Sequence, residues 1–136
     1  MAQEYAATGK YTTLDPTQLA ESMERLEGVC VVATVNEDAT PNAAIFVPTM
    51  PDESHVALVL GPNRTRENIE RTGTCTMVYD VMDPTATTKA ESHRGARLAL
   101  SLVRPDEEEH ARVEAAWPHF NEYTLLLRVE RLELVG

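Results

Sequence analysis

The stretch VCVVATVNEDATPNAAIFVPTMPDESHVALVL, residues 29–60, decides the fold class of this chain. Its apolar segments predict three strands, over residues 29–35, 42–50 and 54–60. The links at residues 36–41 and 51–53 are polar or proline-containing, and they are too short for a helical crossover. We therefore expect antiparallel pairing, and a parallel α/β sheet is disfavoured.

The first of these strands is unusually dense in apolar side chains. Residues 29–35 read Val-Cys-Val-Val-Ala-Thr-Val, without the apolar and polar alternation of a half-solvated strand. A run of this kind is typical of a strand that is buried on both faces. We therefore expect both faces of residues 29–35 to be covered.

Three short helices are expected outside this stretch. The first begins at Asp15, which can cap a helix with Pro16 at its first position and Gln18 completing a capping box, and it ends at Gly28. The second spans residues 66–71 and stops at Gly73. The third helix opens at Arg104-Pro105-Asp106, has an acidic first turn and ends before Pro118; residues 83–92 are expected to form a polar loop.

Further strands are predicted over residues 75–82, 95–103 and 123–135. In the last of them the apolar alternation changes parity, which predicts a bulge near Glu130 and Arg131. Six strands and three short helices predict a mainly β fold, an antiparallel barrel with short helices. The length of 136 residues fits one domain over 1–136, and we expect residues 1–13 to form a flexible N-terminal arm.

Charge and composition exclude several classes of partner. The chain has 22 acidic and 12 basic residues, a formal net charge of -10, which repels polyanions such as nucleic acid. No stretch approaches the roughly 18 apolar residues of a membrane span, and the N-terminus lacks the apolar middle of a signal peptide. We expect a cytoplasmic protein without a membrane or metal site, because the four histidines lack metal-ligand spacing and both cysteines lie in apolar strands.

The run from Gly61 to Ile69, GPNRTRENI, is the most informative for function. A glycine loop that leaves a strand, followed by Arg64 and Thr65 at a helix start, assembles backbone N–H groups, a guanidinium and a hydroxyl. These groups suit a phosphate monoester. The alternative is that Asn63 or Thr65 only caps the helix while the arginines are solvated.

Three runs in consistent order resemble the FMN-binding split-barrel superfamily. They are VVATVNEDATPN (residues 31–42), Asn63-Arg64-Thr65 with Asn68, and HRGARL (residues 93–98), and the resemblance extends over residues 20–135. Within the superfamily, the chain is most similar to the small pyridoxamine-phosphate-oxidase-like proteins and the small bacterial FMN-binding proteins. The resemblance implies a six-stranded antiparallel split barrel that forms a homodimer with FMN in the groove between the protomers.

The resemblance also implies the residues that hold FMN. Arg64 and Thr65 would bind its phosphate, Gly61 and Asn63 would supply the loop, and Asn68 would brace it. The isoalloxazine ring would lie along the second strand. Its contacts there would be Ile45, Phe46, Val47 and Pro48. Without the resemblance, Phe46 and Val47 would be interpreted as barrel core.

Trp117 is the only tryptophan, and it stands at the end of a helix before Pro118. In small FMN-binding relatives an aromatic side chain at this point reaches the flavin of the other protomer, so Trp117 resembles a lid over the ring. The alternative is a tryptophan that anchors its helix to the barrel.

The resemblance implies a flavin-dependent oxidoreductase or electron carrier in which FMN carries the redox chemistry for a small-molecule substrate and no side chain is catalytic. Ala43, Ala44 and Ile45 stand where pyridoxamine-phosphate oxidases place groups for a second phosphate, so we do not expect that substrate. One alternative is a non-enzymatic module that binds flavin, the deazaflavin F420, haem or another phosphorylated ligand. Another is a structural dimer with an empty groove.

Overall fold

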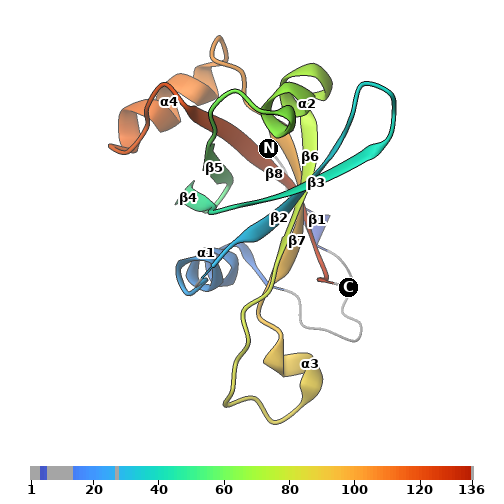
Figure 1. Cartoon of the computed structure of the whole chain (residues 1–136). Coiled ribbons are helices and arrows are strands. Elements are labelled where there is room, and N and C mark those ends of the chain that lie inside the picture. Colours follow the sequence, from blue (N-terminus) through green and yellow to red (C-terminus); the bar gives the residue numbers. More distant parts are fainter. Residues whose placement is uncertain (1–3, 6–13, 27, 136) are drawn as a thin grey trace.

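A curled antiparallel sheet with four helices makes up the computed structural model, which describes residues 4–5, 14–26 and 28–135 (Figure 1). The strands are β1 (Glu4–Tyr5), β2 (Cys30–Val35), β3 (Pro41–Phe46), β4 (Thr49–Asp52), β5 (His55–Val59), β6 (Thr74–Tyr79), β7 (Ala96–Leu102) and β8 (Thr124–Glu133). The helices are α1 (Pro16–Glu24), α2 (Arg64–Thr72), α3 (Lys89–Ser92) and α4 (Glu108–Ala116). The predicted mainly β fold is confirmed.

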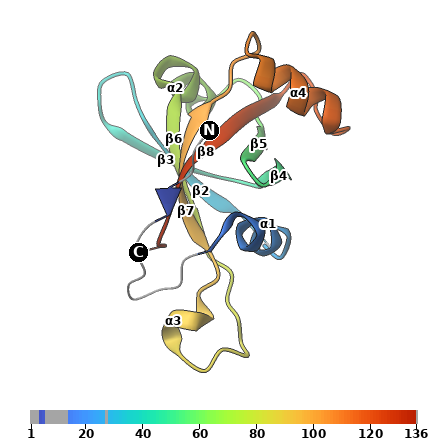
Figure 2. The same cartoon turned by 180° about the vertical axis from the view of Figure 1, so that it is seen from behind.

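The strand order of the sheet is β3-β2-β6-β7-β8-β5-β4, and β1 pairs in parallel with β8. β3 and β4 follow each other in the chain yet lie at opposite ends of this order, because the sheet curls round into a half-barrel (Figures 1 and 2). The path has seven strands, so the expected number of six was wrong. Apart from Glu4–Tyr5, the predicted N-terminal arm lies outside the described residues.

The additional strand arises because the stretch predicted as one strand, residues 42–50, is divided at Val47 and Pro48. Phe46 is the last residue of β3 to pair with β2, and Thr49 already pairs with Ala57 of β5. Pro48 has no N–H group to continue the first ladder. The chain therefore leaves the edge strand β3 here and continues as β4, the strand at the opposite edge of the sheet.

The cap at Asp15 and the stop at Gly73 are confirmed, but α1 already ends at Glu24 and not at Gly28, and α4 begins at Glu108 rather than at residues 104–106. Asp15 caps α1: its carboxylate accepts from the Gln18 N–H at 2.8 Å, and the Gln18 side chain accepts from the Asp15 N–H at 3.0 Å. α2 ends at Gly73, whose φ of 76° is left-handed. α3 was not expected; it forms within the predicted polar loop because the Thr88 hydroxyl accepts from the Glu91 N–H. No helix in the described ranges is long and apolar enough to span a membrane.

The concave side of the sheet holds the main core. Its largest buried side chains come from α1, α2 and most strands, and include Leu19, Val32, Leu58, Ile69, Met77, Leu98, Leu127 and Leu132. A smaller cluster of Val103, Val113, Leu126 and Phe120 lies between β8 and α4. The predicted bulge in β8 is confirmed: Arg131 pairs with Ala99 and Val129 with Leu100, so Glu130 is the extra residue.

The opposite face of the sheet is not covered within the chain. Burial alternates along β2, and Val29, Val31 and Val35 are between 37% and 50% exposed. The expectation of a strand covered on both faces was therefore wrong for the single chain, because the curl encloses only the concave side. On β3, Ile45 is 64% exposed, and Val47 beyond it is 70% exposed. We call this solvent-facing side of β2, β3, β6 and β7 the outer face.

Candidate functional site

The start of α2 is fixed by Asn63 and Arg66. The Asn63 side chain accepts a hydrogen bond from the Arg66 N–H at 2.8 Å, so Asn63 is a helix cap. The Arg66 guanidinium donates to Glu70 at 2.8 Å and to the carbonyls of Leu60 and Tyr123 at 2.8 and 3.1 Å. Arg66 is thus a structural residue that holds the loop after α4 against the start of α2. Gly61, which precedes this turn, is exposed.

Unlike those of Asn63 and Arg66, the side chains of Arg64 and Thr65 make no hydrogen bond within the described part of the chain. Thr65 is only 2% exposed, and its hydroxyl has no hydrogen bond with any residue of the described ranges. Arg64 is exposed. The first N–H groups of a helix also lack partners within the helix. The start of α2 therefore carries a buried hydroxyl and free helix N–H groups, and the neighbouring Arg64 side chain lines a notch beside the helix, where its charge acts on Asp38.

Asn68 joins α2 to the turn between β2 and β3. Its buried amide nitrogen donates to Thr34 Oγ1 at 3.0 Å and to Asn36 Oδ1 at 2.9 Å. Its oxygen accepts from Arg71 at 3.0 Å, and Arg71 also donates to the Val35 carbonyl. Asn68 thus ties α2 to the β2–β3 turn through its side-chain hydrogen bonds.

A polar notch of about 320 Å³ lies between α2 and the β2–β3 turn. Its lining residues are Asn36, Glu37, Asp38, Thr40, Arg64, Glu67, Asn68 and Arg71. Hydrogen bonds from Thr40 lower the pKa of Asp38, which keeps it ionised. With three carboxylates and two guanidinium groups, the notch does not suit a polyanion, so an anion is better placed at the start of α2 than beside the helix.

The four residues predicted to contact the flavin ring form the corner between β3 and β4. Ile45 and Val47 point to solvent, whereas Phe46 packs partly against the core and Pro48 is buried. The core alternative therefore applies to Phe46 but not to Val47. β3 is an edge strand, and one of its sides presents backbone groups without a strand partner. The corner thus offers apolar side chains beside free backbone groups.

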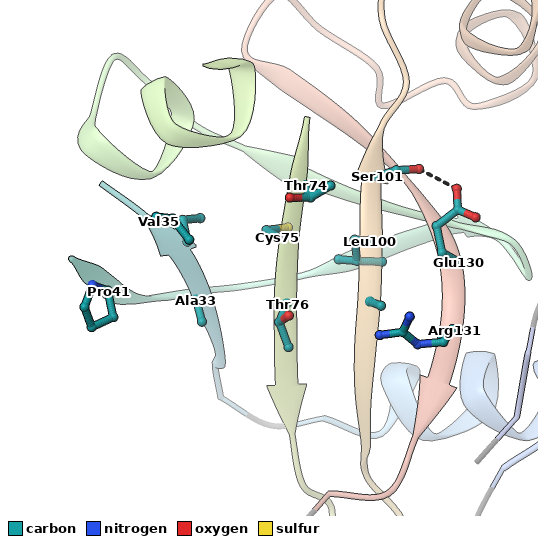
Figure 3. A pocket seen from close by; sticks show the side chains of 12 residues that line it. Ala33, Val35, Pro41, Thr74, Cys75, Thr76, Leu100, Ser101, Glu130 and Arg131 are labelled. Carbon is teal, nitrogen blue, oxygen red and sulfur yellow. Dashed lines mark hydrogen bonds between the residues drawn. The ribbon is translucent and has the colours of Figure 1, made fainter. Parts of the chain in front are cut away.

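The middle of the outer face has a hollow of about 530 Å³ that sequence reasoning missed (Figure 3). Ala33, Thr76 and Ala99, neighbours across β2, β6 and β7, contribute small side chains to its lining. Glu130 and Arg131 line it on β8, where Glu130 accepts from the Ser101 hydroxyl at 2.6 Å. Only the strand register, which brings small residues from distant segments together, reveals this hollow.

Trp117 is the C-cap residue of α4 and is half-buried. Its ring packs edge-to-face with Phe120 at 6.2 Å and with His119 at 5.7 Å, measured between ring centroids. The Arg66–Tyr123 hydrogen bond ties the segment that follows to the start of α2. α2 and α4 therefore lie at the same end of the molecule (Figure 1). Ile45–Pro48 lie at the β3–β4 corner instead.

His93 lies beside a second apolar depression that was not predicted. Its Nδ1 is 2.6 Å from Asp80 Oδ2, which orients the ring. The depression measures about 430 Å³, and Val29, Val31, Val78 and Val135 line it together with Tyr79. Asp80 and His93 are 13 residues apart in sequence, and only the β6–β7 pairing brings them together.

Comparisons with known proteins identify solved structures that have a similar fold. No protein-family model matches the chain, and no curated protein is significantly similar to it in sequence. Among solved structures, an FMN-binding protein from Syntrophomonas wolfei is 14% identical with a TM-score of 0.57, over 85% of this chain and 82% of that one. A candidate pyridoxamine 5'-phosphate oxidase from Lactobacillus delbrueckii is 20% identical with a TM-score of 0.54, over 87% and 91%.

A haem-binding protein from Mycobacterium smegmatis has the same fold. It is 14% identical with a TM-score of 0.52, over 87% of this chain and 52% of that one. At these identities the likeness concerns the fold. The fold that the resemblance implied is thus found again in these structures.

Proposed function

We propose that two copies of this split barrel form a dimer that holds FMN between them and acts as a flavin-dependent oxidoreductase or electron carrier. The observation that carries the proposal is the uncovered outer face, where Val29, Val31, Val35, Ile45 and Val47 are all exposed. Contiguous apolar surface of this kind marks an interface or a ligand groove. A second copy would cover it and supply the second wall of a groove that is too open in one chain to bury a flavin.

The start of α2 supports FMN over a ligand with a longer anionic tail. Arg64, the Thr65 hydroxyl and the first N–H groups of α2 fit one phosphate group, and the carboxylates of the adjacent notch disfavour the polyanionic tail of F420. Bound FMN would supply the hydride or electron transfer. The β3–β4 corner of one copy would receive the isoalloxazine ring, and Trp117 of the other copy would cover that ring.

Identification of the bound small molecule tests the cofactor. We expect mass spectrometry of gently purified protein to find FMN, with absorbance near about 450 nm, and anaerobic NADH or NADPH to bleach it. Absorbance near about 420 nm alone would point to the deazaflavin. Bound flavin that neither nucleotide nor dithionite reduces would contradict the redox role.

The dimer is tested by light scattering on the parent and on Val31→Lys, which places a charge on the outer face. We expect twice the chain mass for the parent, and a monomer without flavin for the variant. Glu21→Lys on the exposed side of α1 is the control and should leave both properties unchanged. A monomer that binds FMN with the affinity of the parent would rule out a site shared by two copies.

A haem-binding module is the second candidate, and the observation that favours it is His93. A carboxylate that orients a histidine beside an apolar depression is a common arrangement around ligated iron. Titration with haem discriminates the two: a Soret band that shifts in His93→Ala but not in Arg64→Ala supports haem. A flavin spectrum that depends on Arg64 supports FMN.

A further inference from the structure

His55 occupies a buried ionic cluster between the sheet and α4. It is 3% exposed and lies on β5 opposite Arg128 of β8. Its Nδ1 is 2.8 Å from Asp52 Oδ1, and its Nε2 is 2.5 Å from Glu109 Oε2 on the first turn of α4. One ring therefore contacts two carboxylates from different elements.

This geometry requires the doubly protonated form of His55. Ionised carboxylates can only accept hydrogen bonds, so both ring nitrogens must donate. Burial alone would lower the pKa of His55, but the hydrogen bonds and charges of Asp52 and Glu109 outweigh it and raise the pKa above its ordinary value. A neutral ring keeps one proton, and its other nitrogen would then direct a lone pair at a carboxylate oxygen.

The remaining charges around His55 are paired with one another. The Arg128 guanidinium donates to Glu109 at 2.8 Å and to Glu107 at 3.2 Å, and lies 3.6 Å from Glu130. Arg112, also on α4, acts on Asp52 through its charge alone. Within the described part of the chain, His55 is the only cation that forms hydrogen bonds with both Asp52 and Glu109. Deprotonation of His55 removes this shared positive charge.

The apolar contact between α4 and the sheet is small. Only His110 and Val113 of the helix are buried, and Val113 packs in the cluster with Val103 and Leu126. Ionic contacts from the sheet, made by His55 to Glu109 and by Arg128 to Glu107 and Glu109, are therefore a substantial part of what holds the helix. The Asp52 contact lies within the β4–β5 turn, whereas Glu109 belongs to α4, so only the Glu109 contact joins His55 to the helix.

We propose that protonated His55, together with Arg128, holds α4 on the sheet and that deprotonation of His55 loosens the helix. The helix loosens as the pH rises, since the proton is then lost from a ring between two carboxylates. Trp117 and its ring contacts at the end of α4 move with the helix. The device does not depend on the identity of the cofactor.

Hydrogen exchange of the α4 amides, measured against those of β7 from about pH 5.5 to about pH 9.5, tests the proposal in the full-length chain. NMR of the four imidazole rings over the same range gives the titration of His55. We expect the protection of α4, corrected for the intrinsic exchange rate, to fall about ten- to a hundredfold as His55 titrates, because a charged hydrogen bond is lost. Protection of β7 should stay constant.

Variants separate His55 from the other histidines. His55→Gln should abolish the pH dependence of α4 protection, whereas His93→Gln, which removes another carboxylate-paired histidine far along the chain, should retain it. Trp117 fluorescence provides a second readout in a His119→Gln background, because the His119 ring contacts Trp117 and would quench it on protonation. We expect its transition to coincide with that of α4 exchange.

Glu109→Gln keeps the test decisive if His55→Gln fails to fold. It should move the titration of His55 and the transition of α4 together to lower pH. Protection of α4 that stays constant while His55 titrates would overturn the proposal. So would an unchanged α4 transition in His55→Gln, or one that fails to follow the His55 titration in Glu109→Gln.

Discussion

Thr65 combines two properties that rarely coincide in a folded protein. It is almost fully buried, yet its hydroxyl has no hydrogen bond with any other residue in the part of the chain that the structure describes. A buried polar group without a partner costs stability, so such a group is retained where a ligand satisfies it. In the proposed function, the phosphate of FMN at the start of α2 would be that ligand.

Thr65→Val tests this role, since it removes the hydroxyl and keeps the volume. We expect the free energy of unfolding of the apo-protein to be unchanged or to rise by up to about 1 kcal/mol, and FMN binding to weaken by about 1 kcal/mol. Arg64→Ala should weaken FMN binding by about 2 to 4 kcal/mol, because it leaves the phosphate charge poorly compensated.

Titration of the apo-proteins with FMN measures both effects, and Arg25→Ala, an exposed arginine at the end of α1, serves as the control. If Arg64→Ala and Thr65→Val bound FMN as tightly as Arg25→Ala, the phosphate would have to lie elsewhere.

At the scale of elements, α2 depends on Asn68 for its position against the β2–β3 turn. Asn68→Ala would remove hydrogen bonds to Thr34, Asn36 and Arg71, and the buried Thr34 hydroxyl would lose one of its partners. We expect the free energy of unfolding to fall by about 2 to 4 kcal/mol in denaturant titrations. Glu67→Ala, on the exposed side of the same helix, should change it by less than about 0.5 kcal/mol. Equal stabilities of the two variants would contradict the bracing role.

The end of α4 gives a second test at this scale, because Trp117 is half-buried and packs on rings rather than in the main core. Trp117→Leu should brighten the fluorescence of bound FMN and weaken binding by roughly 0.5 to 1.5 kcal/mol, the contribution of an aromatic pair. The unfolding midpoint of the apo-protein should hardly change. A loss of about 2 kcal/mol or more of apo stability, with unchanged flavin fluorescence, would instead make Trp117 a core anchor.

For the whole molecule, the ionic cluster predicts loss of stability both as the pH falls, through Glu109, and as the pH rises, through His55. Hydrogen bonds from Arg128, opposed by burial and aided by His55, lower the pKa of Glu109 from its ordinary 4.5 to about 2. Its contribution is therefore complete above about pH 4.5 and is lost as the pH falls toward 2. The pKa of His55 is raised, so its contribution is complete at low pH and is lost as the pH rises through the folded value.

Comparison of the parent with Glu109→Gln isolates the acid side. At neutral pH we expect the free energy of unfolding of the variant to be roughly 1 to 3 kcal/mol lower than that of the parent. This difference should shrink as the pH falls toward the pKa of Glu109. Urea titrations at several pH values measure it. A difference independent of pH would show that Glu109 contributes by packing and not by its charge.

Several elements follow from residues that are close together in the chain. The links at residues 36–41 and 51–53 cannot carry a helical crossover, so antiparallel pairing was predictable. The cap at Asp15, the stop at Gly73 and the bulge at Glu130 are also confirmed, since each depends on backbone geometry within a few residues. The division of residues 42–50 at Pro48 was missed although the proline was visible, because the apolar run outweighed it.

The candidate site was predictable only as a set of residues. The chain by itself determined that Asn63, Arg64, Thr65 and Asn68 share a helix start, because they are neighbours in sequence. The tertiary structure decided which of them cap or brace the helix, which face of β2 stays uncovered, and that His55 meets Glu109, 54 residues away. The physical reason is that capping and turn signals act over one or two turns of backbone, whereas strand register and the curl of the sheet result from the packing of the whole chain.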